Sequence, residues 1–400
     1  MSSVPILVLN SGSSSIKFAL FNADPTEREK LFEGAVDGIG TEHGKFWIKD
    51  AAGNKLRDEA PALPTAAVAF KLVADALSQP PFPYPAAIGH RMVNGGPNLT
   101  VHQRITPALI NEMVSFTAFA PLHTPIATYI MRQALELFPG LPNFVCFDTA
   151  FHRTMPEVAK RFAIPEQYYR EGIHRFGFHG ISYESIIDAL EQEGNVPEKL
   201  IVAHLGNGAS ITAIHHGKCI DTSMGLTPCG GVVSGTRTGD IDPSVLIYIL
   251  RSLAKTAPDT LTAADQLEAI ANKKSGLLGV SELTNDMRGL RDAIKTGNQQ
   301  AAMAAAIFAR TAKKFIGSYI AVLGGLDALV FTGGIGENDI AARSEICAGL
   351  EIFGIKVDAT RNNVRGLATI SPEGAPVTVR VIPPAEDLMI TNHVYRLLNS

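Results

Sequence analysis

Residues 6–20 of the chain, ILVLNSGSSSIKFAL, contain an apolar run, a loop rich in glycine and serine, and a second run in which apolar and other residues alternate. This pattern predicts a β-hairpin whose polar loop covers residues 10–15. Residues 200–214, LIVAHLGNGASITAI, show the same arrangement in the second half of the chain, with a loop at residues 204–209. Because the hairpin recurs, we expect a duplicated fold.

Strands and helices alternate along the rest of the chain. Apolar residues at helical spacing predict helices, and short β-rich runs predict buried strands. The predicted helices cover residues 68–77, 126–138, 301–323 and 386–398, and the predicted strands cover residues 143–147 and 328–331. This alternation is typical of an α/β fold. We expect an N-terminal domain at residues 1–150, a nucleotide-binding C-terminal domain at residues 151–385, and a last helix, 386–400, that packs back on the first domain.

The composition excludes several classes of protein. The 400 residues are enough for two or three domains of about 100–200 residues each. Lys and Arg number 35 against 39 Asp and Glu, so the net charge of −4 gives no general attraction to nucleic acid or to an anionic membrane. The longest apolar stretch, residues 319–331, is interrupted by Asp327 and is shorter than the roughly 20 residues of a membrane helix. We expect a cytoplasmic protein with no nucleic-acid or membrane partner.

The cysteines do not form a zinc pattern. They show neither C-x-x-C spacing nor a nearby histidine pattern of the zinc type, and they stand at Cys146, Cys219, Cys229 and Cys347. We therefore predict reduced, buried thiols. His215 and His216 precede Gly217 at a predicted hairpin turn, which places both histidines on the surface.

Three loops of small residues suggest phosphate binding. In the hairpin loops at residues 10–15 and 204–209, backbone N–H groups can approach a phosphate closely, and Lys17 adds a cation beside the first loop. We interpret Gly333–Gly336, which follows a predicted strand, as a third such loop. None of the loops fits GxxxxGK[ST], and Gly333–Gly336 lacks the full GxGxxG pattern, which excludes a Walker-type P-loop and a dinucleotide fingerprint. Each loop alone can be purely structural, but together they favour a nucleotide.

Charged residues beside glycines and at a strand end are candidates for the chemistry. Arg91 in GHRMVNGG and Arg237 in GTRTGD carry guanidinium groups that can hold a carboxylate or a phosphoryl group at two points, although either could instead form a surface ion pair. Asp148 follows a predicted strand and could hold Mg²⁺ through water or cap a helix. Four further candidates are histidines in loops, namely His123, His152, His179 and His204.

Taken together, these motifs resemble the acetate kinase family of short-chain acyl kinases along nearly the whole chain. The matching stretches are NSGSSSIKF, HRMVNGG, APLHTP, FDTAFH, RFGFHGISYE, HLGNGASI, DTSMGLTPCGG, GTRTGDIDPS, SGLLGVSELTNDMR, FTGGIGEN and VIPPAED. The resemblance implies a two-domain actin-like fold with a duplicated βββαβαβα core, and a homodimer. It also implies reversible in-line transfer of the ATP γ-phosphoryl group to acetate, giving acetyl phosphate and ADP, with Mg²⁺ or Mn²⁺.

The same resemblance implies roles for individual residues. Arg91 and Arg237 would hold acetate and the phosphoryl group, His179 would contact that group, His123 would lie nearby, and Asp148 would act beside them. The apolar pocket for the acid would consist of Val93, Leu122, Phe178 and Pro228. The nucleotide would contact Ser13, Ser15, Lys17, His204, Asn207, Gly208, Gly333, Gly334, Ile335, Gly336 and Asn338. Mg²⁺ would be associated with Asn10, Asp148 and Glu386.

Several positions depart from the pattern of the family. These are Asn94, Thr124, Tyr183 and Asp387, and they leave the acid and the metal preference open. One alternative is therefore a propionate or other short-chain acyl kinase of the same fold. A sugar kinase would need an aspartate base to deprotonate a hydroxyl group. The other alternative is a non-catalytic actin-like protein that binds a nucleotide.

Overall fold

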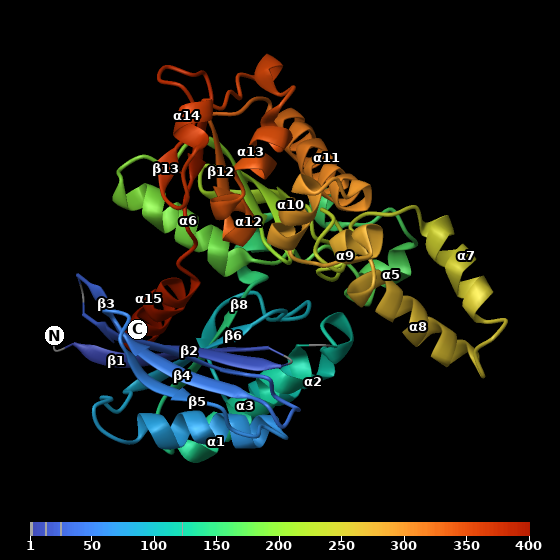
Figure 1. Cartoon of the computed structure of the whole chain (residues 1–400). Coiled ribbons are helices and arrows are strands. Elements are labelled where there is room, and N and C mark those ends of the chain that lie inside the picture. Colours follow the sequence, from blue (N-terminus) through green and yellow to red (C-terminus); the bar gives the residue numbers. More distant parts are fainter. Residues whose placement is uncertain (1–2, 13, 25, 122) are drawn as a thin grey trace. The chain divides into compact units, whose positions relative to one another are not determined.

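The computed structural model describes residues 3–12, 14–24, 26–121 and 123–400, which form two compact units, each built on its own β-sheet (Figure 1). Unit 1 comprises Met1–Phe151, Gly180–Ser185 and Ala385–Ser400, and unit 2 comprises His152–His179 and Ile186–Pro384. The units differ from the expected domains, 1–150 and 151–385, mainly at Gly180–Ser185. This short segment from the middle of the chain contributes to unit 1.

The sheet of unit 1 has the strand order β5-β4-β3-β2-β1-β6-β8-β7. Its strands are β1 (Val4–Ser11), β2 (Ser15–Ala23), β3 (Arg28–Asp37), β4 (Lys45–Asp50), β5 (Lys55–Glu59), β6 (Ala87–Met92), β7 (Gln103–Arg104) and β8 (Asn143–Phe147). The predicted first hairpin is confirmed, since β1 and β2 are antiparallel with Asn10 opposite Lys17. Strands β1, β6 and β8 are parallel neighbours, so their carboxyl ends meet at one edge of the sheet.

Both faces of β1 are buried, which explains its continuous apolar run. Leu7 and Leu9 pack in a core with helices α1 (Ala66–Leu77) and α3 (Thr124–Leu137). Ile6 and Val8 pack in a second core with the last helix, α15 (Glu386–Leu398). Helix α15 crosses β6 at Gly89, where a Cβ atom would lie 2.7 Å from methyl groups of Ile390 and Val394. The C-terminal helix therefore covers the sheet of unit 1.

The sheet of unit 2 repeats the central pattern of unit 1. Its strand order is β11-β10-β9-β12-β14-β13, and its strands are β9 (Lys199–Leu205), β10 (Ala209–His215), β11 (Lys218–Thr222), β12 (Ala328–Thr332), β13 (Ala368–Thr369) and β14 (Thr378–Val381). The series β11-β10-β9-β12-β14 has the same antiparallel and parallel pairings as β3-β2-β1-β6-β8. The predicted duplication is thus confirmed.

Helices surround both sheets. The other helices are α2 (Pro107–Ser115), α4 (Glu157–Lys160), α5 (Glu166–Arg170), α6 (Gly180–Gln192), α7 (Pro243–Leu253), α8 (Thr260–Lys273), α9 (Gly276–Ser281), α10 (Met287–Lys295), α11 (Gln299–Leu323), α12 (Gly333–Asn338), α13 (Ile340–Cys347) and α14 (Ala359–Asn362), with 3₁₀ turns at Thr117–Phe119, Ala150–Thr154 and Glu351–Phe353. Helix α11 packs on β9 and β10 and ends at Gly324, whose φ of 65° is the left-handed conformation expected of a glycine that closes a helix.

The interpretation of Gly333–Gly336 as a loop is wrong, because these residues begin helix α12. Gly333 has a φ of 77°, and a Cβ atom there would lie 2.8 Å from the carbonyl oxygen of Leu205, so only glycine fits. At the other end of α12, the fully buried Arg343 donates from Nη1 to the carbonyl oxygens of Gly336 and Glu337, at 2.8 and 2.9 Å. Tertiary contacts therefore stabilise a helix that the glycines disfavour locally.

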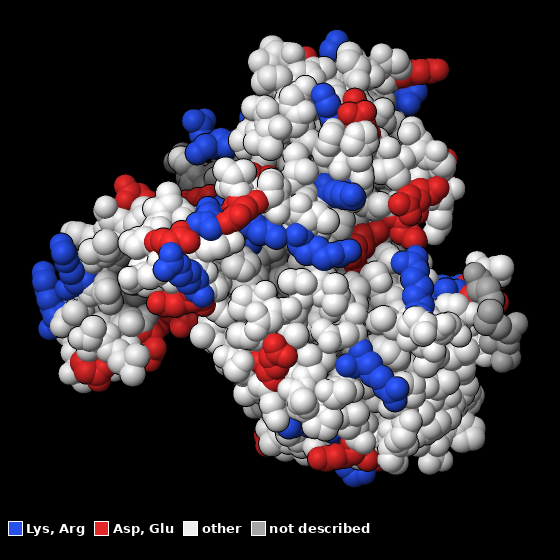
Figure 2. Space-filling view, turned by 180° about the vertical axis from the view of Figure 1, so that it is seen from behind, with Lys and Arg blue, Asp and Glu red and all other residues white. Residues whose placement is uncertain are grey.

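Other expectations concern the surface and the cysteines. Cys146, Cys219 and Cys347 are buried free thiols, whereas the prediction of burial is wrong for Cys229, which is only partly buried in its loop. His216 is exposed in the turn between β10 and β11, as predicted, whereas His215 is the last residue of β10 and is partly buried. Acidic and basic side chains are interspersed among uncharged ones on the face shown in Figure 2. No helix within the described ranges is both long enough and apolar enough to cross a membrane.

Candidate active site

Arg91 lies at the carboxyl end of β6, between the ends of β1 and β8. Its Nε and Nη2 atoms donate to the two carboxylate oxygens of Asp148, at 2.9 and 2.6 Å, and Asp148 directly follows β8. Its Nη1 atom donates to Oδ1 of Asn10 at the end of β1, at 3.2 Å. Three predicted site residues from three adjacent parallel strands therefore meet at one edge of the sheet in unit 1.

Helix α15 adds two carboxylates to this group. Glu386 and Asp387 are in its first turn, and Oε2 of Glu386 lies 3.9 Å from Nε of Arg91. Burial acts to lower the pKa of Arg91, but the negative charges of Asp148 and Glu386 outweigh burial and raise it. Burial and the neighbouring Glu386 raise the pKa of Asp387. The single guanidinium thus faces more negative charge than it can neutralise.

This excess of negative charge, together with the oxygen-only donor set, fits a hard divalent cation. Mg²⁺ usually binds one or two carboxylates and completes its shell with water and substrate phosphates. Among the described residues, the sets of three His, Cys, Asp or Glu side chains with ligand atoms within 4.8 Å of one another lie elsewhere, at His102–Glu184–His393 and Glu198–His215–His216. Asn10, Asp148 and Glu386 therefore fit a cation that keeps much of its water, and they do not form a closed protein cage.

The first hairpin carries other predicted residues to the same end of the sheet. Ser15 begins β2, and Lys17 is exposed in β2 opposite Asn10. Lys17 is among the positive charges that act to lower the pKa of Asp387, although burial outweighs them. Ser13 and Leu122 lie outside the described residues, so the structure does not test their predicted roles.

A second group of predicted residues meets in unit 2 around the loop between β9 and β10. His179 directly precedes α6, its Nδ1 atom lies 2.9 Å from Oγ of Ser210, and its ring stacks on that of His204 with centroids 4.2 Å apart. A Cβ atom at Gly208 would lie 3.2 Å from Nη1 of Arg237 and 3.4 Å from Nε2 of His179. The absence of a side chain at residue 208 therefore leaves space for the arginine and the histidine.

Arg237 differs from Arg91 in its electrostatic surroundings. It is partly buried, its Nη1 donates to the carbonyl oxygen of Pro228 at 3.3 Å, and burial lowers its pKa. Within the described part of the chain, no carboxylate lies within 4.0 Å of its guanidinium group. A desolvated cation without a carboxylate partner is suited to bind an anion from solution.

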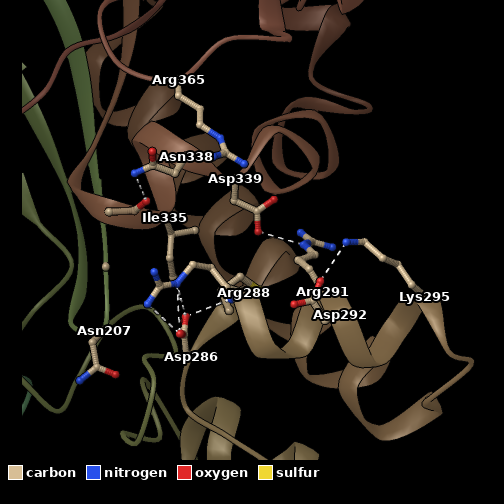
Figure 3. Close-up of a pocket in the computed structure, with 13 residues that line it drawn as sticks. Asn207, Asp286, Arg288, Arg291, Asp292, Lys295, Ile335, Asn338, Asp339 and Arg365 are labelled. Atoms are coloured by element: carbon tan, nitrogen blue, oxygen red, sulfur yellow. Dashed lines mark hydrogen bonds and ion pairs between the residues drawn. The ribbon is translucent and has the colours of Figure 1, made fainter.

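A cavity of about 700 Å³ in unit 2 adjoins the same loop (Figure 3). Its lining includes the predicted residues Asn207, Gly334, Ile335 and Asn338, whereas Gly333 and Gly336 are buried within α12. The other lining residues are Gly206, Asp286, Met287, Arg288, Arg291, Asp292, Lys295, Asp339 and Arg365. A volume of this size is typical of small-molecule sites.

Asp286 and Arg288, at the start of α10, were missed as site residues. Arg288 donates from Nε and Nη2 to Oδ2 of Asp286, at 3.1 and 2.9 Å, beside Ile335 (Figure 3). The available signal was the stretch SGLLGVSELTNDMR, whose last three residues are Asp286, Met287 and Arg288.

The remaining predicted residues are spread over both units. Val93 is partly buried just after β6 in unit 1, and His123 directly precedes α3. Phe178 is buried in unit 2, where Pro228 also lies. The apolar acid pocket therefore stays a prediction. Asn94, one of the departures, is buried and accepts a 2.7 Å hydrogen bond at Oδ1 from the N–H of Gly96, so it shapes the turn after Arg91.

Comparisons with known proteins agree with this arrangement. The model of the Acetokinase family matches residues 5–392. An acetate kinase from Anoxybacillus flavithermus is 42% identical over 98% of this chain and 99% of its own length. The crystal structure of Porphyromonas gingivalis acetate kinase is similar with a TM-score of 0.88 and 36% identity, covering 99% of this chain and all of that one. The crystal structure of a propionate kinase from Francisella tularensis is similar with a TM-score of 0.90 and 37% identity, and it also covers 99% of this chain and all of that one.

Fold, site and similarities define the class of protein. The duplicated α/β units, with a desolvated arginine and a cavity of about 700 Å³ in one of them, are those of a kinase that transfers a phosphoryl group. The chain belongs to the acetokinase family.

Proposed function

We propose that this protein is an acetate kinase, which transfers the γ-phosphoryl group of ATP to acetate and gives acetyl phosphate and ADP. Arg237 is the observation that carries the proposal most directly. It is a desolvated cation without a carboxylate partner among the described residues, and it lies beside the loop whose Gly206 and Asn207 line the cavity in unit 2. We assign the cavity to the nucleoside and Arg237 to the phosphoryl group.

Within unit 2, the nucleotide would lie between α12 and the start of α10. Ile335 and Arg288 would contact the base and ribose, and Asn207 and Asn338 would add polar contacts. Gly208 and His204 would lie toward the phosphates, because their loop also contacts His179 and Arg237. Ser13, Ser15 and Lys17 keep their expected role as contacts to the phosphates.

The chemistry needs no protein nucleophile and no general base, because a carboxylic acid is already ionised at neutral pH. One carboxylate oxygen of acetate forms a bond to the γ-phosphorus as the bond from that phosphorus to the β–γ bridging oxygen breaks, and the electron pair leaves on ADP. Such an in-line transfer is promoted mainly by positioning and by neutralising charge on the phosphoryl oxygens. We assign that neutralisation to Arg91, Arg237 and His179, with His123 nearby.

Asn10, Asp148 and Glu386 would hold Mg²⁺, which Mn²⁺ could replace. Their oxygen donors and the excess negative charge around Arg91 support this assignment. When bound, the cation supplies charge neutralisation to the β- and γ-phosphate oxygens. Asp148 also orients Arg91 through its two hydrogen bonds, so a change at Asp148 affects both the cation and the guanidinium.

Acetate is proposed over propionate because Val93, Leu122, Phe178 and Pro228 would form a small apolar pocket. The similarity to solved structures does not separate the two acids, since an acetate kinase and a propionate kinase give TM-scores of 0.88 and 0.90. A short-chain acyl kinase that prefers propionate is therefore the second candidate. We place the reaction in the cytoplasm, where ATP is available.

A homodimer is also proposed, with helix α7 at the interface. Val245, Ile247 and Tyr248 in this helix are 41%, 49% and 75% exposed, and no residue of α7 is buried. Within unit 2, α7 and α8 extend away from the sheet (Figure 1). Sedimentation velocity should show a dimer that Tyr248→Asp dissociates. A wild-type monomer would contradict the proposal.

The proposed reaction is tested by trapping its product. The purified protein is incubated with MgATP, acetate and hydroxylamine, which converts an acyl phosphate into a coloured hydroxamate. We expect hydroxamate with acetate, less with propionate, and none with glucose in place of the acid. Arg237→Ala is the control for a contaminating kinase. Failure of the wild-type protein to form any hydroxamate, with either acid, would exclude an acyl kinase.

A further inference from the structure

A partly buried cluster outside the residues assigned to the reaction joins three segments of unit 1. Glu184 in α6 has its Oε2 atom 2.9 Å from Nε2 of His393 in α15 and 3.4 Å from Nε2 of His102, which precedes β7. The two imidazole rings lie 4.1 Å apart. All three side chains are at most 15% exposed. Such a group must be hydrogen bonded or bind a ligand to be stable.

The hydrogen-bond pattern defines the protonation of the cluster. Burial acts to raise the pKa of Glu184, but the hydrogen bonds from the two histidines outweigh burial and lower it to about 2, so Glu184 is ionised. An ionised carboxylate can only accept, which makes both Nε2 atoms donors. His102 also accepts at Nδ1 from the backbone N–H of Phe147, at 3.1 Å. Its single ring proton in the neutral form is therefore on Nε2.

This pattern disfavours a metal ion at the cluster. A metal bound at Nε2 of His102 would displace the proton to Nδ1, where it would face the N–H of Phe147. His393 has its pKa lowered, chiefly by burial, so it is neutral and also donates from Nε2. The three side chains thus form a hydrogen-bonded clasp, which we name the Glu184 clasp.

The Glu184 clasp is linked to Asp148 from both sides. His102 holds the N–H of Phe147, which directly precedes Asp148. The carbonyl oxygen of Asp148 accepts from the N–H of Gly180, one helical turn before Glu184, at 2.8 Å. A Cβ atom at Gly180 would lie 2.2 Å from that carbonyl oxygen, so the helix approaches as closely as a glycine allows.

The clasp is also linked to Glu386. Oγ of Ser185, the neighbour of Glu184, accepts from the N–H of Ala385 at 3.1 Å, immediately before α15. His393 follows Glu386 by two helical turns, and residues seven apart lie on nearly the same side of a helix. Two hydrogen bonds therefore fix α15, one from His393 to Glu184 and one from Ala385 to Ser185. Together they set the position of its first turn along the helix axis and its rotation about that axis.

We propose that Glu184 is a positioning residue, which through His102 and His393 holds Asp148 and Glu386 in place around Arg91. The inference rests on the proposed function, because it concerns the residues assigned to Mg²⁺ and the acid. Removing partners that orient metal-binding carboxylates typically costs about 10- to 100-fold in activity or metal affinity. Loss of the clasp should have an effect of this size without any direct contact to a substrate.

The test compares Glu184→Ala and Glu184→Gln with Glu198→Ala. Glu198 is the matched control, because it also lies beside two histidines, His215 and His216, but on the surface of unit 2. We expect Glu184→Ala to lower kcat at least about tenfold and to raise the Mg²⁺ concentration for half activity. Glu184→Gln keeps an oxygen acceptor and should recover part of the loss, and Glu198→Ala should match the wild type. Folded Glu184→Ala with wild-type kcat and Mg²⁺ dependence would overturn the proposal.

Two further measurements keep the test decisive if Glu184→Ala does not fold. His393→Leu removes one donor, and an unchanged Mg²⁺ requirement in this variant would also overturn the proposal. In ¹⁵N-histidine spectra of the wild type, His102 and His393 should show protonated, slowly exchanging Nε2 atoms, and rapidly exchanging protons would refute the clasp. This readout does not depend on activity, so it separates failure of the clasp from failure of the acyl kinase reaction.

Zinc provides the last arm of the experiment. The chelator-treated protein is titrated with Zn²⁺ in a His215→Ala, His216→Ala background, which removes the two histidines beside Glu198. We expect no stoichiometric binding. One bound Zn²⁺ per chain that disappears with Glu184→Ala would show a metal site and overturn the positioning role.

Discussion

Arg91 and Asp148 form a two-point ion pair across the ends of two parallel strands, with both carboxylate oxygens engaged. Arg237, the other arginine assigned to the phosphoryl group, lacks a carboxylate partner among the described residues. Arg91 is therefore bound into the architecture of unit 1, whereas Arg237 is a desolvated cation in unit 2 that we assign to an anion. The two should respond differently to the same substitution.

Arg91→Ala and Arg237→Ala should each lower kcat at least about 100-fold, because each removes a cation that stabilises charge in the transition state. Arg91→Ala should also lower the melting temperature, since Asp148, only 1% exposed, loses its guanidinium partner. Arg237→Ala should leave the melting temperature nearly unchanged. Steady-state kinetics and calorimetry on both variants test this, and more than a tenth of wild-type kcat in a folded variant would disprove its assigned role.

Glu386→Gln should raise the Mg²⁺ concentration needed for half activity, because it replaces an anion beside Arg91 with a neutral amide. The competing explanation is that Glu386 only stabilises the start of α15. A lower melting temperature with an unchanged Mg²⁺ titration would favour that explanation. Glu373→Gln, at a side chain that is 95% exposed, serves as the control.

Asp387 should make stability depend on pH. Burial and Glu386 raise its folded-state pKa, so the folded protein holds this proton more tightly than the unfolded chain. Its contribution to stability is complete below the ordinary aspartate range and is lost as the pH rises through the raised pKa. In metal-free buffer, Asp387→Asn should therefore melt higher than the wild type at pH 8, and the difference should shrink toward pH 4. If the difference in melting temperature between the variant and the wild type grew on acidification, the raised pKa of Asp387 would be refuted.

Gly208→Ala should lower kcat about tenfold by displacing a catalytic group, since small misplacements cost activity steeply. The new methyl group would lie 3.2 Å from Nη1 of Arg237 and 3.4 Å from Nε2 of His179. The matched control is Gly317→Ala in α11, where a Cβ atom meets nothing within 4 Å. That control should keep wild-type kcat and gain stability from better helix propensity. Equal kcat in the two variants would remove Gly208 from the site.

Val93→Ala should shift specificity toward propionate. Val93 lies two residues after Arg91 and is partly buried, and its truncation opens space of about the size that a longer acid adds. One methylene in an apolar pocket is worth about 1–3 kcal/mol, so the KM for propionate relative to acetate should fall roughly tenfold. The measurement is kcat/KM for acetate and for propionate, in the wild type and in Val93→Ala. An unchanged ratio with a lower melting temperature would show that Val93 is only a packing residue.

The sequence was informative where hydrophobic pattern and chain direction act locally. The run from Ile6 to Leu9, the strand at 143–147 and the helix at 301–323 each carry a strong apolar signal, and all three form as predicted. Strand β5 was missed because every residue from Lys55 to Glu59 is exposed, which leaves no apolar alternation. Its pairing with β4 depends on backbone hydrogen bonds, which no side-chain pattern reveals.

Sequence patterns did not predict the contacts between segments that are far apart in the chain. The helical state of Gly333–Asn338 depends on Arg343 and on the close approach to Leu205. The ion pair of Arg91 with Asp148 could be anticipated from two strand ends. Glu184, His102 and His393 are far apart in the sequence, and of these only Glu184 lies in one of the matching stretches, RFGFHGISYE. Only the returning course of α15 brings these three side chains together.

The same returning course of α15 constrains how the protein is made. The face of the unit 1 sheet that carries Ile6 and Val8 is covered by Met389, Ile390 and Val394. A ribosome synthesises these residues only after all of unit 2, so the part of that face beneath α15 stays uncovered while more than half of the chain emerges. Unit 2 can complete its own core first, and until α15 arrives the exposed apolar surface of the nascent N-terminal sheet favours aggregation.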